Sequence, residues 1–443
     1  MIEPYLESFQ AFSANGGAAA PDWARALRLS AITRFETLGF PTTHNEDWHF
    51  TSVGRIVEAN FTPRTHESGN VSSADLAPFA FGEAGWHTLV FVNGQYNAAL
   101  SGGADLPAGV RVLPLALAFD ELPKLVEQHM GRIASMDAHT FTALNTAFIN
   151  DGAVVHVTED VQVALPIHLL FVTDAAVAGG VAQPRNLIVI DRHAKATIIE
   201  SYAGIGDGAY FTNAVTETVV GHGATLTHLK LQRESAQAYH VGTLDVRQGR
   251  DSHLFSFSFA TGALLSRTNV YTELRGEGCG ATLNGLYLGD GDQHIDHQTR
   301  IEHVEPNCYS RELYKGILDG AAHGVFNGKV FVHPAAQKTD GKQTNNTLLL
   351  SERAQIDTKP QLEIFADDVK CTHGATVGRL DETSLFYMKS RGINARTARE
   401  LLTYAFAADV LETIECAEVR EGLEEATLKR YIDQHRDTPL RNV

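Results

Sequence analysis

The segment DDVKCTHGATVG places a thiol at Cys371 and an imidazole at His373, two side chains that bind iron and other soft metals. In an extended strand, residues two apart project to the same face, so both groups could reach one iron or one sulfur species. Lys370 would lower the pKa of the neighbouring thiol. Two ligands leave a tetrahedral site incomplete, so a metal here would need further ligands, for example from another chain. The alternatives are a structural cysteine beside a histidine, and a Cys–His nucleophile with a third orienting group.

A second group of potential metal ligands, His294, Asp296, His297 and His303, lies in DGDQHIDHQTRIEH. On a strand His294 and His297 would point to opposite faces, whereas a metal-binding pair needs both imidazoles on one face. The spacing therefore favours a polar network on the protein surface over a metal site.

Bulk properties exclude several classes of partner and catalyst. The net charge of −17 disfavours binding to nucleic acid or to an anionic membrane. Gly328 and Lys329 are followed by Val330 rather than by the hydroxyl residue of a phosphate-binding loop. The scattered cysteines, the absence of a bilayer-length apolar run and the lack of a signal peptide at the N-terminus together predict a cytoplasmic protein.

The elements that position these residues belong to a long region of short strands. A small-residue turn followed by a strand recurs after 28, 28 and 29 residues when the copies are aligned on Ala196, Ala224, Ser252 and Ala281. A unit of this length is too short for a βαβ unit with its own helix and fits one coil of a β-solenoid. A β-sandwich with regular strand spacing is the rival interpretation.

Alternation within the copies indicates strands with one buried and one solvated face. Phe255, Phe257 and Phe259 share one side of a strand, and Ser256 and Ser258 share the other. We therefore expect the phenylalanines in the core and the serines in water.

Helical patterns flank the strands on both sides. Apolar spacing predicts a helix over 22–38 that ends at Gly39, and another helix near 116–130. From Arg391 onward an apolar stripe predicts a further helix, which Gly422 would interrupt before a last helix. The chain is thus expected to comprise an N-terminal helical and mixed region (1–165), a β core (166–380) and a C-terminal helical domain (381–443).

Several sequence blocks in the second half resemble the SufB/SufD family of iron–sulfur cluster assembly scaffold proteins. They are SRELYKGILDG, NGKVFVHPAAQKTDGKQTNNTLLLSE, TKPQLEIFADDVKCTHGATVG and RGINARTARELLTYAF, in that order over about 100 residues. NEDWHFTSV at 45–53 resembles a further block of the family, and KCTHGATVG followed by FYMKSRGI favours its SufD branch.

The resemblance implies a right-handed parallel β-helix with helical regions at both ends, and a scaffold subunit rather than an enzyme. It implies pairing with a SufB-like subunit and docking of a SufC-like ATPase on the C-terminal helices, with a homodimer as a further form in isolation. Cys371 and His373 would lie at the SufB interface and contact a transient iron–sulfur cluster or iron shared with SufB, with no permanently bound cofactor. Leu401, Tyr404 and Phe406 would contribute to SufC docking.

Two alternatives remain beside this interpretation. One is a solenoid carbohydrate-active enzyme that uses paired carboxylates. The other is a purely structural subunit whose Cys371 and His373 contact SufB without touching metal.

Overall fold

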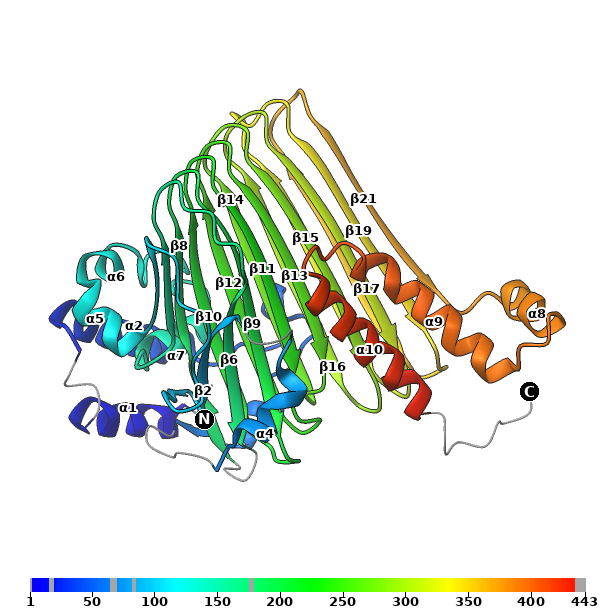
Figure 1. Ribbon diagram of the computed structural model, residues 1–443, viewed down its shortest axis with the longest axis horizontal. Helices are drawn as coiled ribbons and strands as arrows, with labels where there is room; N and C mark the ends of the chain where they lie inside the picture. The colour runs from blue at the N-terminus through cyan, green and yellow to red at the C-terminus, as the bar shows by residue number, and fades with distance from the viewer. Residues whose placement is uncertain (1, 16–19, 64–69, 82–84, 175–178, 435–443) are drawn as a thin grey trace.

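A computed structural model describes residues 2–15, 20–63, 70–81, 85–174 and 179–434 and shows a parallel β-helix with helices at both ends (Figure 1). Successive strands alternate between two sheets, and each strand pairs in parallel with the equivalent strand of the next coil. One sheet runs in the order β20, β18, β16, β14, β12, β10, β8, β5 and β4, and the other in the order β21, β19, β17, β15, β13, β11, β9, β6, β2 and β3. The expected parallel β-helix is confirmed.

The first sheet comprises β4 (Val110–Pro114), β5 (Ala153–Val157), β8 (Arg185–Ile190), β10 (Phe211–Val220), β12 (Tyr239–Gln248), β14 (Leu265–Leu274), β16 (His294–His303), β18 (His323–Val332) and β20 (Gln355–Ile364), with β1 (Thr62–Pro63) and β7 (Gly180–Ala182) beside it. The second comprises β2 (His87–Val92), β3 (Gln95–Tyr96), β6 (Ile167–Asp174), β9 (Lys195–Ile205), β11 (Thr225–Arg233), β13 (His253–Thr261), β15 (Gly280–Gly289), β17 (Tyr309–Leu318), β19 (Asp340–Leu349) and β21 (Lys370–Gly378).

The coil register corrects the repeat alignment derived from the sequence. Ala196 pairs with Leu226, which pairs with Leu254 and then Ala281. Ala224 and Ser252 lie two residues earlier, at the corner before each strand. The repeat itself is real. Because small residues occupy both the corner and the strand, aligning the copies on small residues placed two of them two residues out of register.

Both faces of β13 are buried, contrary to the expectation of one wet face. Ser256 and Ser258 are each 2% exposed because they point into the β-helix. Phe257 and Phe259 point outward and are covered by the C-terminal helices, with which they form one apolar cluster. The interior of the middle coils therefore mixes polar side chains with apolar ones such as Leu226, Leu254 and Leu283. The outward side of these strands is an apolar surface that the helices cover.

The corner preceding the second-sheet strands uses the left-handed backbone conformation in successive coils. Positive φ angles between 54° and 76° occur at His193, Gly223, Asp251, Gly278, Asn307 and Lys338. Such φ values strain β-branched side chains and suit glycine, asparagine and aspartate. The corner sequences GHGA, GRDS, GEGC and EPNC satisfy this requirement.

N-terminal helices pack on the outer face of the first sheet. They are α1 (Glu3–Asn15), α2 (Asp22–Leu38), α3 (Gly54–Glu58) and α7 (Thr140–Ala147), and they share an apolar cluster with Phe211, Val241 and Leu265. The helix predicted over 22–38 is confirmed, and Gly39 ends it at φ 63°. The helix predicted near 116–130 is instead two helices, α5 (Leu115–Glu121) and α6 (Pro123–His129), because Pro123 starts a new helix. Short turns η2 (Glu46–Trp48), α4 (Ser73–Leu76) and η3 (Ala77–Phe79) complete this region.

The C-terminal region folds into α8 (Glu382–Ser390), α9 (Ala395–Leu411) and α10 (Ala417–Gln434), and residues 435–443 of the predicted domain lie outside the described residues. Gly422 does not interrupt a helix, contrary to expectation, because it lies inside α10. A Cβ at this position would lie 3.0 Å from the Phe81 ring, so a larger residue would fit only if the ring shifted. None of the helices in the described part of the chain combines the length and apolar character needed to cross a bilayer.

Candidate functional site

The last coil of the β-helix leaves an open end. β20 and β21 terminate the two sheets, and among the described residues neither strand has a neighbour on its far side. The backbone groups along such an edge can pair with a strand of another chain. Ile364, Phe365 and Val377 are exposed apolar side chains at this end, with Phe365 at 58% exposure. The end of the β-helix therefore has the properties of a surface for another protein.

Cys371 and His373 both lie on β21 at this open end. They are in register with Gly341 and Gln343 of β19. A Cβ on Gly341 would lie 3.4 Å from Cys371 Sγ and 3.5 Å from Ser310 Oγ, so the missing side chain leaves room for the thiol on the inner side of the coil. Cys371 is half-buried and His373 is exposed. Because the two residues are two apart on one strand, they share a face.

The thiol of Cys371 is held in its neutral form. Burial raises its pKa above the ordinary value, the nearby Asp340 carboxylate adds to this effect, and a hydrogen bond from the Gly341 backbone opposes it. The expectation that Lys370 lowers this pKa is wrong. Lys370 is the residue next to Cys371 on the strand, so its side chain points to the opposite face. A bound metal ion is one source of the positive charge that favours a thiolate.

A buried pair of polar side chains lies next to His373 in the ladder, and the sequence reasoning did not predict it. Gln343, the ladder partner of His373, donates through Nε2 to Glu312 Oε2 at 2.6 Å. Burial raises the pKa of Glu312 to about 7. The other carboxylate oxygen and the Gln343 amide oxygen are buried without a hydrogen-bond partner. The coil register, once known, would have found this pair because it aligns Glu312, Gln343 and His373.

The histidines of the 294–303 segment lie on opposite faces of β16. His294 points outward and contacts Thr51 Oγ1 at 2.9 Å. His297 and His303 are buried inside the β-helix, where His303 contacts Ser310 and His297 lies between the rings of Tyr287 and Tyr314. Within the described ranges, no three His, Cys, Asp or Glu residues are grouped to hold a metal ion. The polar network was expected on the surface, but it lies largely inside, because alternate residues of β16 face the interior.

The NEDWHFTSV block attaches the N-terminal region to the first sheet. Arg267 Nη1 donates to the Asp47 carbonyl at 2.6 Å and to the buried Asp296 carboxylate at 2.7 Å. Its guanidinium lies 3.7 Å from the centre of the Trp48 ring, and Thr51 Oγ1 donates to Asp296 at 2.6 Å. Cation–π and charge-assisted contacts of this kind are strong when buried, so the block is a structural latch.

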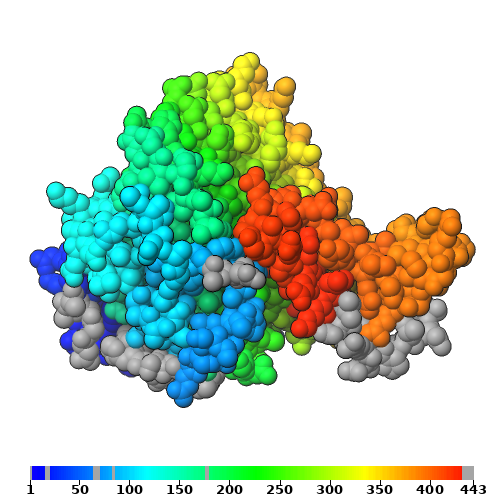
Figure 2. Space-filling view, in the orientation of Figure 1, coloured from blue at the N-terminus to red at the C-terminus, as the bar shows by residue number. Residues whose placement is uncertain are grey.

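The predicted docking residues on α9 differ in their surroundings. Leu401 is exposed and Tyr404 is half-buried. Phe406 packs toward the β-helix, where Lys315 Nζ lies 4.6 Å from its ring centre and donates to its carbonyl at 3.0 Å. Sequence reasoning did not select Phe386 and Tyr387 on α8, although they are 72% and 58% exposed. α8 and the start of α9 form a lobe that projects from the body of the molecule (Figure 2, orange).

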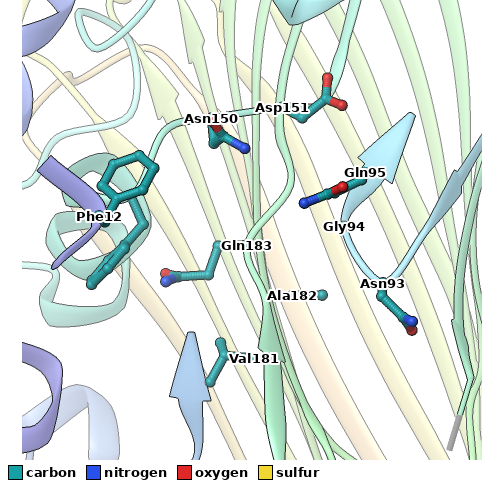
Figure 3. Close-up of a pocket in the computed structure, with 10 residues that line it drawn as sticks. Phe12, Asn93, Gly94, Gln95, Asn150, Asp151, Val181, Ala182 and Gln183 are labelled. Carbon is teal, nitrogen blue, oxygen red and sulfur yellow. The ribbon is translucent and has the colours of Figure 1, made fainter. Parts of the chain in front are cut away.

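A small hollow near the N-terminal cap offers little for chemistry. The amide side chains of Gln95, Asn150 and Gln183 gather around it, together with Phe12 (Figure 3). Burial raises the pKa of the adjoining Asp151 to about 6, but its carboxylate is occupied by the backbone N–H groups of Tyr96 and Gly152. The cavity measures about 30 Å³, which is room for a water molecule and too little for a cofactor.

Comparison with known proteins assigns this architecture to a class. The family model for the SufBD core domain of the SUF system for FeS cluster assembly matches residues 171–406, and the model for the SufBD protein N-terminal region matches residues 2–169. The chain therefore belongs to the SufB/SufD family of the SUF iron–sulfur cluster assembly system.

Individual relatives cover nearly the whole chain. The iron–sulfur cluster assembly protein SufD of Escherichia coli is 33% identical over 95% of this chain and 94% of its own length. A SufBD family protein for iron–sulfur cluster assembly from Synechocystis is 34% identical over 91% of this chain and 90% of its own length. SufD of Bacillus subtilis is 29% identical over 91% of this chain and 93% of its own length. These matches give no support to the alternative of a carbohydrate-active enzyme.

Proposed function

We propose that this chain is a SufD-type scaffold subunit that works in the cytoplasm without catalysing a reaction of its own. It pairs with a SufB-like subunit through the open end of its β-helix and docks a SufC-like ATPase on its C-terminal helices. Iron or a nascent iron–sulfur cluster is the cargo at the seam between the two scaffolds, and no cofactor is bound permanently.

The observation that carries the proposal is the position of Cys371 and His373 on the uncapped coil. Both residues lie on the terminal strand of the second sheet, whose outer edge is unpaired among the described residues. A second β-helix that pairs with this edge would bring its own side chains next to them. The half-built site would then gain the remaining ligands that a tetrahedral iron requires.

His373 is the stronger candidate ligand because its imidazole is exposed, and imidazole is a common metal ligand. Cys371 must be deprotonated, and burial opposes this in the isolated chain. A metal at the seam would supply the positive charge that offsets the cost.

We expect a His373→Ala variant, co-expressed with SufB-like and SufC-like partners, to form a complex of normal size that has lost most of its iron and acid-labile sulfide. The physical reason is that removal of an exposed ligand leaves the coil intact and the site one ligand short. Iron and sulfide assays on the complex after size-exclusion chromatography provide the measurement. Cys371→Ser should reduce the iron and sulfide content in the same direction.

Thr372→Ala is the matched control, because Thr372 lies between the two residues and points to the opposite face of β21. It should leave both assays unchanged. Normal iron and sulfide in the His373→Ala/Cys371→Ser double variant would favour the alternative of a purely structural subunit.

The helical lobe supplies a surface for the ATPase. α8 presents Phe386 and Tyr387, α9 presents Leu401 and Tyr404, and Phe406 is engaged with the β-helix. Lys315 links the two parts, since it lies on β17 and its Nζ is 2.5 Å from the Asp409 carboxylate of α9. When ATP brings two SufC-like subunits together, their pull on α9 would pass through this contact into the coils next to the open end.

We expect Phe386→Asp and Leu401→Asp to weaken binding of a purified SufC-like ATPase by about 30-fold or more, as loss of an apolar anchor at the centre of an interface does. Isothermal titration calorimetry measures the effect. Leu29→Asp is the control, because Leu29 is 58% exposed on α2 in the N-terminal region. Equal affinity for all three variants would place the docking surface elsewhere.

A further inference from the structure

The thiols of Cys279 and Cys308 meet at one corner of the β-helix. Each cysteine is the residue immediately before a strand of the second sheet, Cys279 before β15 and Cys308 before β17. The two strands are neighbours in register, with Gly280 opposite Tyr309, and Tyr309 N donates to the Cys279 carbonyl at 3.0 Å. Neighbouring strands are about 4.8 Å apart. This separation falls within the range of about 4.4–6.8 Å between the Cα atoms of a disulfide.

The environment of the pair separates it from an ordinary buried cysteine. The adjacent Cys308 thiol lowers the pKa of Cys279, and the Ser252 hydroxyl assists, while burial opposes the shift. The same contact and burial raise the pKa of Cys308. In the dithiol state, Cys279 Sγ donates to the Gly249 carbonyl at 2.8 Å and Cys308 Sγ donates to the Gly276 carbonyl at 3.3 Å. The two sulfur atoms thus share one corner, and Cys279 is the member of the pair whose pKa is lowered.

Metal binding is a poor explanation for this arrangement. The described residues contain no group of three His, Cys, Asp or Glu side chains suited to a metal ion, and this corner is no exception. The neighbouring corner side chain in the preceding coil is Ser252, whose hydroxyl is 3.8 Å from Cys279 Sγ. A pair of adjacent thiols with no third ligand is suited to two-electron sulfur chemistry.

The corner is close to solvent, although both thiols are fully buried. Glu277 and Gly278 in the turn before Cys279 are half-buried, and Asn307 before Cys308 is exposed. One layer of turn residues therefore separates the sulfur atoms from water. A small oxidant needs only a local opening of that turn, whereas a protein reductant needs a wider one.

We propose that Cys279 and Cys308 form a reversible disulfide site that hydrogen peroxide closes and a dithiol reductant reopens. The Cys279 thiolate attacks peroxide, so that an S–O bond forms, the O–O bond breaks and hydroxide leaves. Cys308 then attacks the sulfenic sulfur, so that the S–S bond forms, the S–O bond breaks and water leaves. The two sulfurs lose two electrons, peroxide gains them, and the two thiol protons end in water.

The disulfide would fasten two adjacent coils in the middle of the β-helix without altering its topology, since the two Cα atoms are already neighbours in the ladder. The site is separate from the seam proposed above, because Cys371 lies two coils further on, at the open end. Oxidation here is thus independent of the cargo residues.

The test uses the full chain with Cys371→Ser and Cys416→Ser, which leaves only the two buried thiols. After hydrogen peroxide treatment and acid quenching, we expect the intact mass to fall by two hydrogen atoms. Peptide mapping should find one cross-link between residues 279 and 308, and dithiothreitol should restore the original mass. Thermal unfolding of the oxidised form should shift upward by several degrees.

Adding Cys308→Ser to the same background provides the matched control, which should gain oxygen at Cys279 or remain unchanged and should never lose two hydrogen atoms. Two outcomes would overturn the proposal. One is an oxidised dithiol protein that still contains two free thiols when it is unfolded in acid and titrated. The other is accumulation of sulfinic acid at either cysteine without the cross-link.

Discussion

Replacing Glu217 by alanine is expected to lower the free energy of unfolding by about 3–5 kcal/mol, because it leaves the guanidinium of Arg185 buried without its counter-charge. Both side chains are fully buried, and Arg185 Nη2 lies 2.7 Å from Glu217 Oε2. The carboxylate also accepts from the backbone N–H groups of Gly131, Ile133 and Ala134 at 2.7 to 2.9 Å. The substitution therefore leaves the Arg185 guanidinium without its counter-charge and three backbone N–H groups without their acceptor.

Chemical denaturation gives the stability difference, and hydrogen exchange locates it. We expect the largest loss of protection in residues 131–134 and in α7, since Arg185 also donates to Asn145 and Thr146 of that helix. Glu159→Ala is the matched control. Glu159 forms an ion pair with Arg192 that is about half exposed, so its loss should cost less than about 1 kcal/mol. Equal losses of stability for the two variants would show that Glu217 does not hold residues 131–134 and α7 in place.

Lowering the pH from about 7.5 to 5 is expected to destabilise the protein by about 2 kcal/mol for each histidine that is buried in its neutral form. Burial lowers the pKa of His168 and His297 to about 3 and that of His294 and His303 to about 4. The native state then binds fewer protons than the unfolded chain. The contribution of each histidine is complete above pH 6.5 and is lost progressively as the pH falls.

Glu312 acts in the opposite direction. Its pKa is raised to about 7, so its contribution is present at low pH and is lost as the pH rises toward 7. Its contribution to the pH dependence of the free energy of unfolding offsets that of about one of the histidines. Glu312→Gln should therefore make the acid-induced loss of stability steeper.

His297→Phe is the informative variant for this prediction. Both ring nitrogens of His297 lack a partner, and the ring packs between Tyr287 and Tyr314. Lys230 adds to the downward shift of its pKa and Asp296 opposes it. Phenylalanine should keep the packing and reduce the pH dependence by about 2 kcal/mol. Denaturation midpoints at pH 7.5, 6.5, 5.5 and 5 measure the slope, and a slope equal to that of the unmodified protein would contradict the prediction.

Local sequence patterns predicted the structure correctly where one residue type determines one local conformation. Gly39 ended the helix over 22–38 as predicted, and the alternation of Phe255, Phe257 and Phe259 correctly identified a strand. The sequence blocks around Cys371 and His373 identified the family, which the comparisons confirm.

The features that the sequence did not predict depend on packing between segments that are far apart in the chain. Alternation indicates that two faces differ, but it does not say which face is covered by a distant helix. For this reason Ser256 and Ser258 were expected in water and are buried inside the β-helix. The role of Gly422 depends on the Phe81 ring of a distant segment, and the pairing of Cys279 with Cys308 depends on the coil register.

The two ends of the β-helix differ in strand direction, and this difference limits growth. At the N-terminal end β3 and β4 run antiparallel to their neighbours, so the parallel ladder of the described residues ends there. At the other end β20 and β21 continue the parallel ladder to its last residue pair. If two such chains pair through these parallel ends, the outward ends of the pair carry the antiparallel strands, which among the described residues do not repeat the same contact, so growth into a fibre by this contact would stop at two chains.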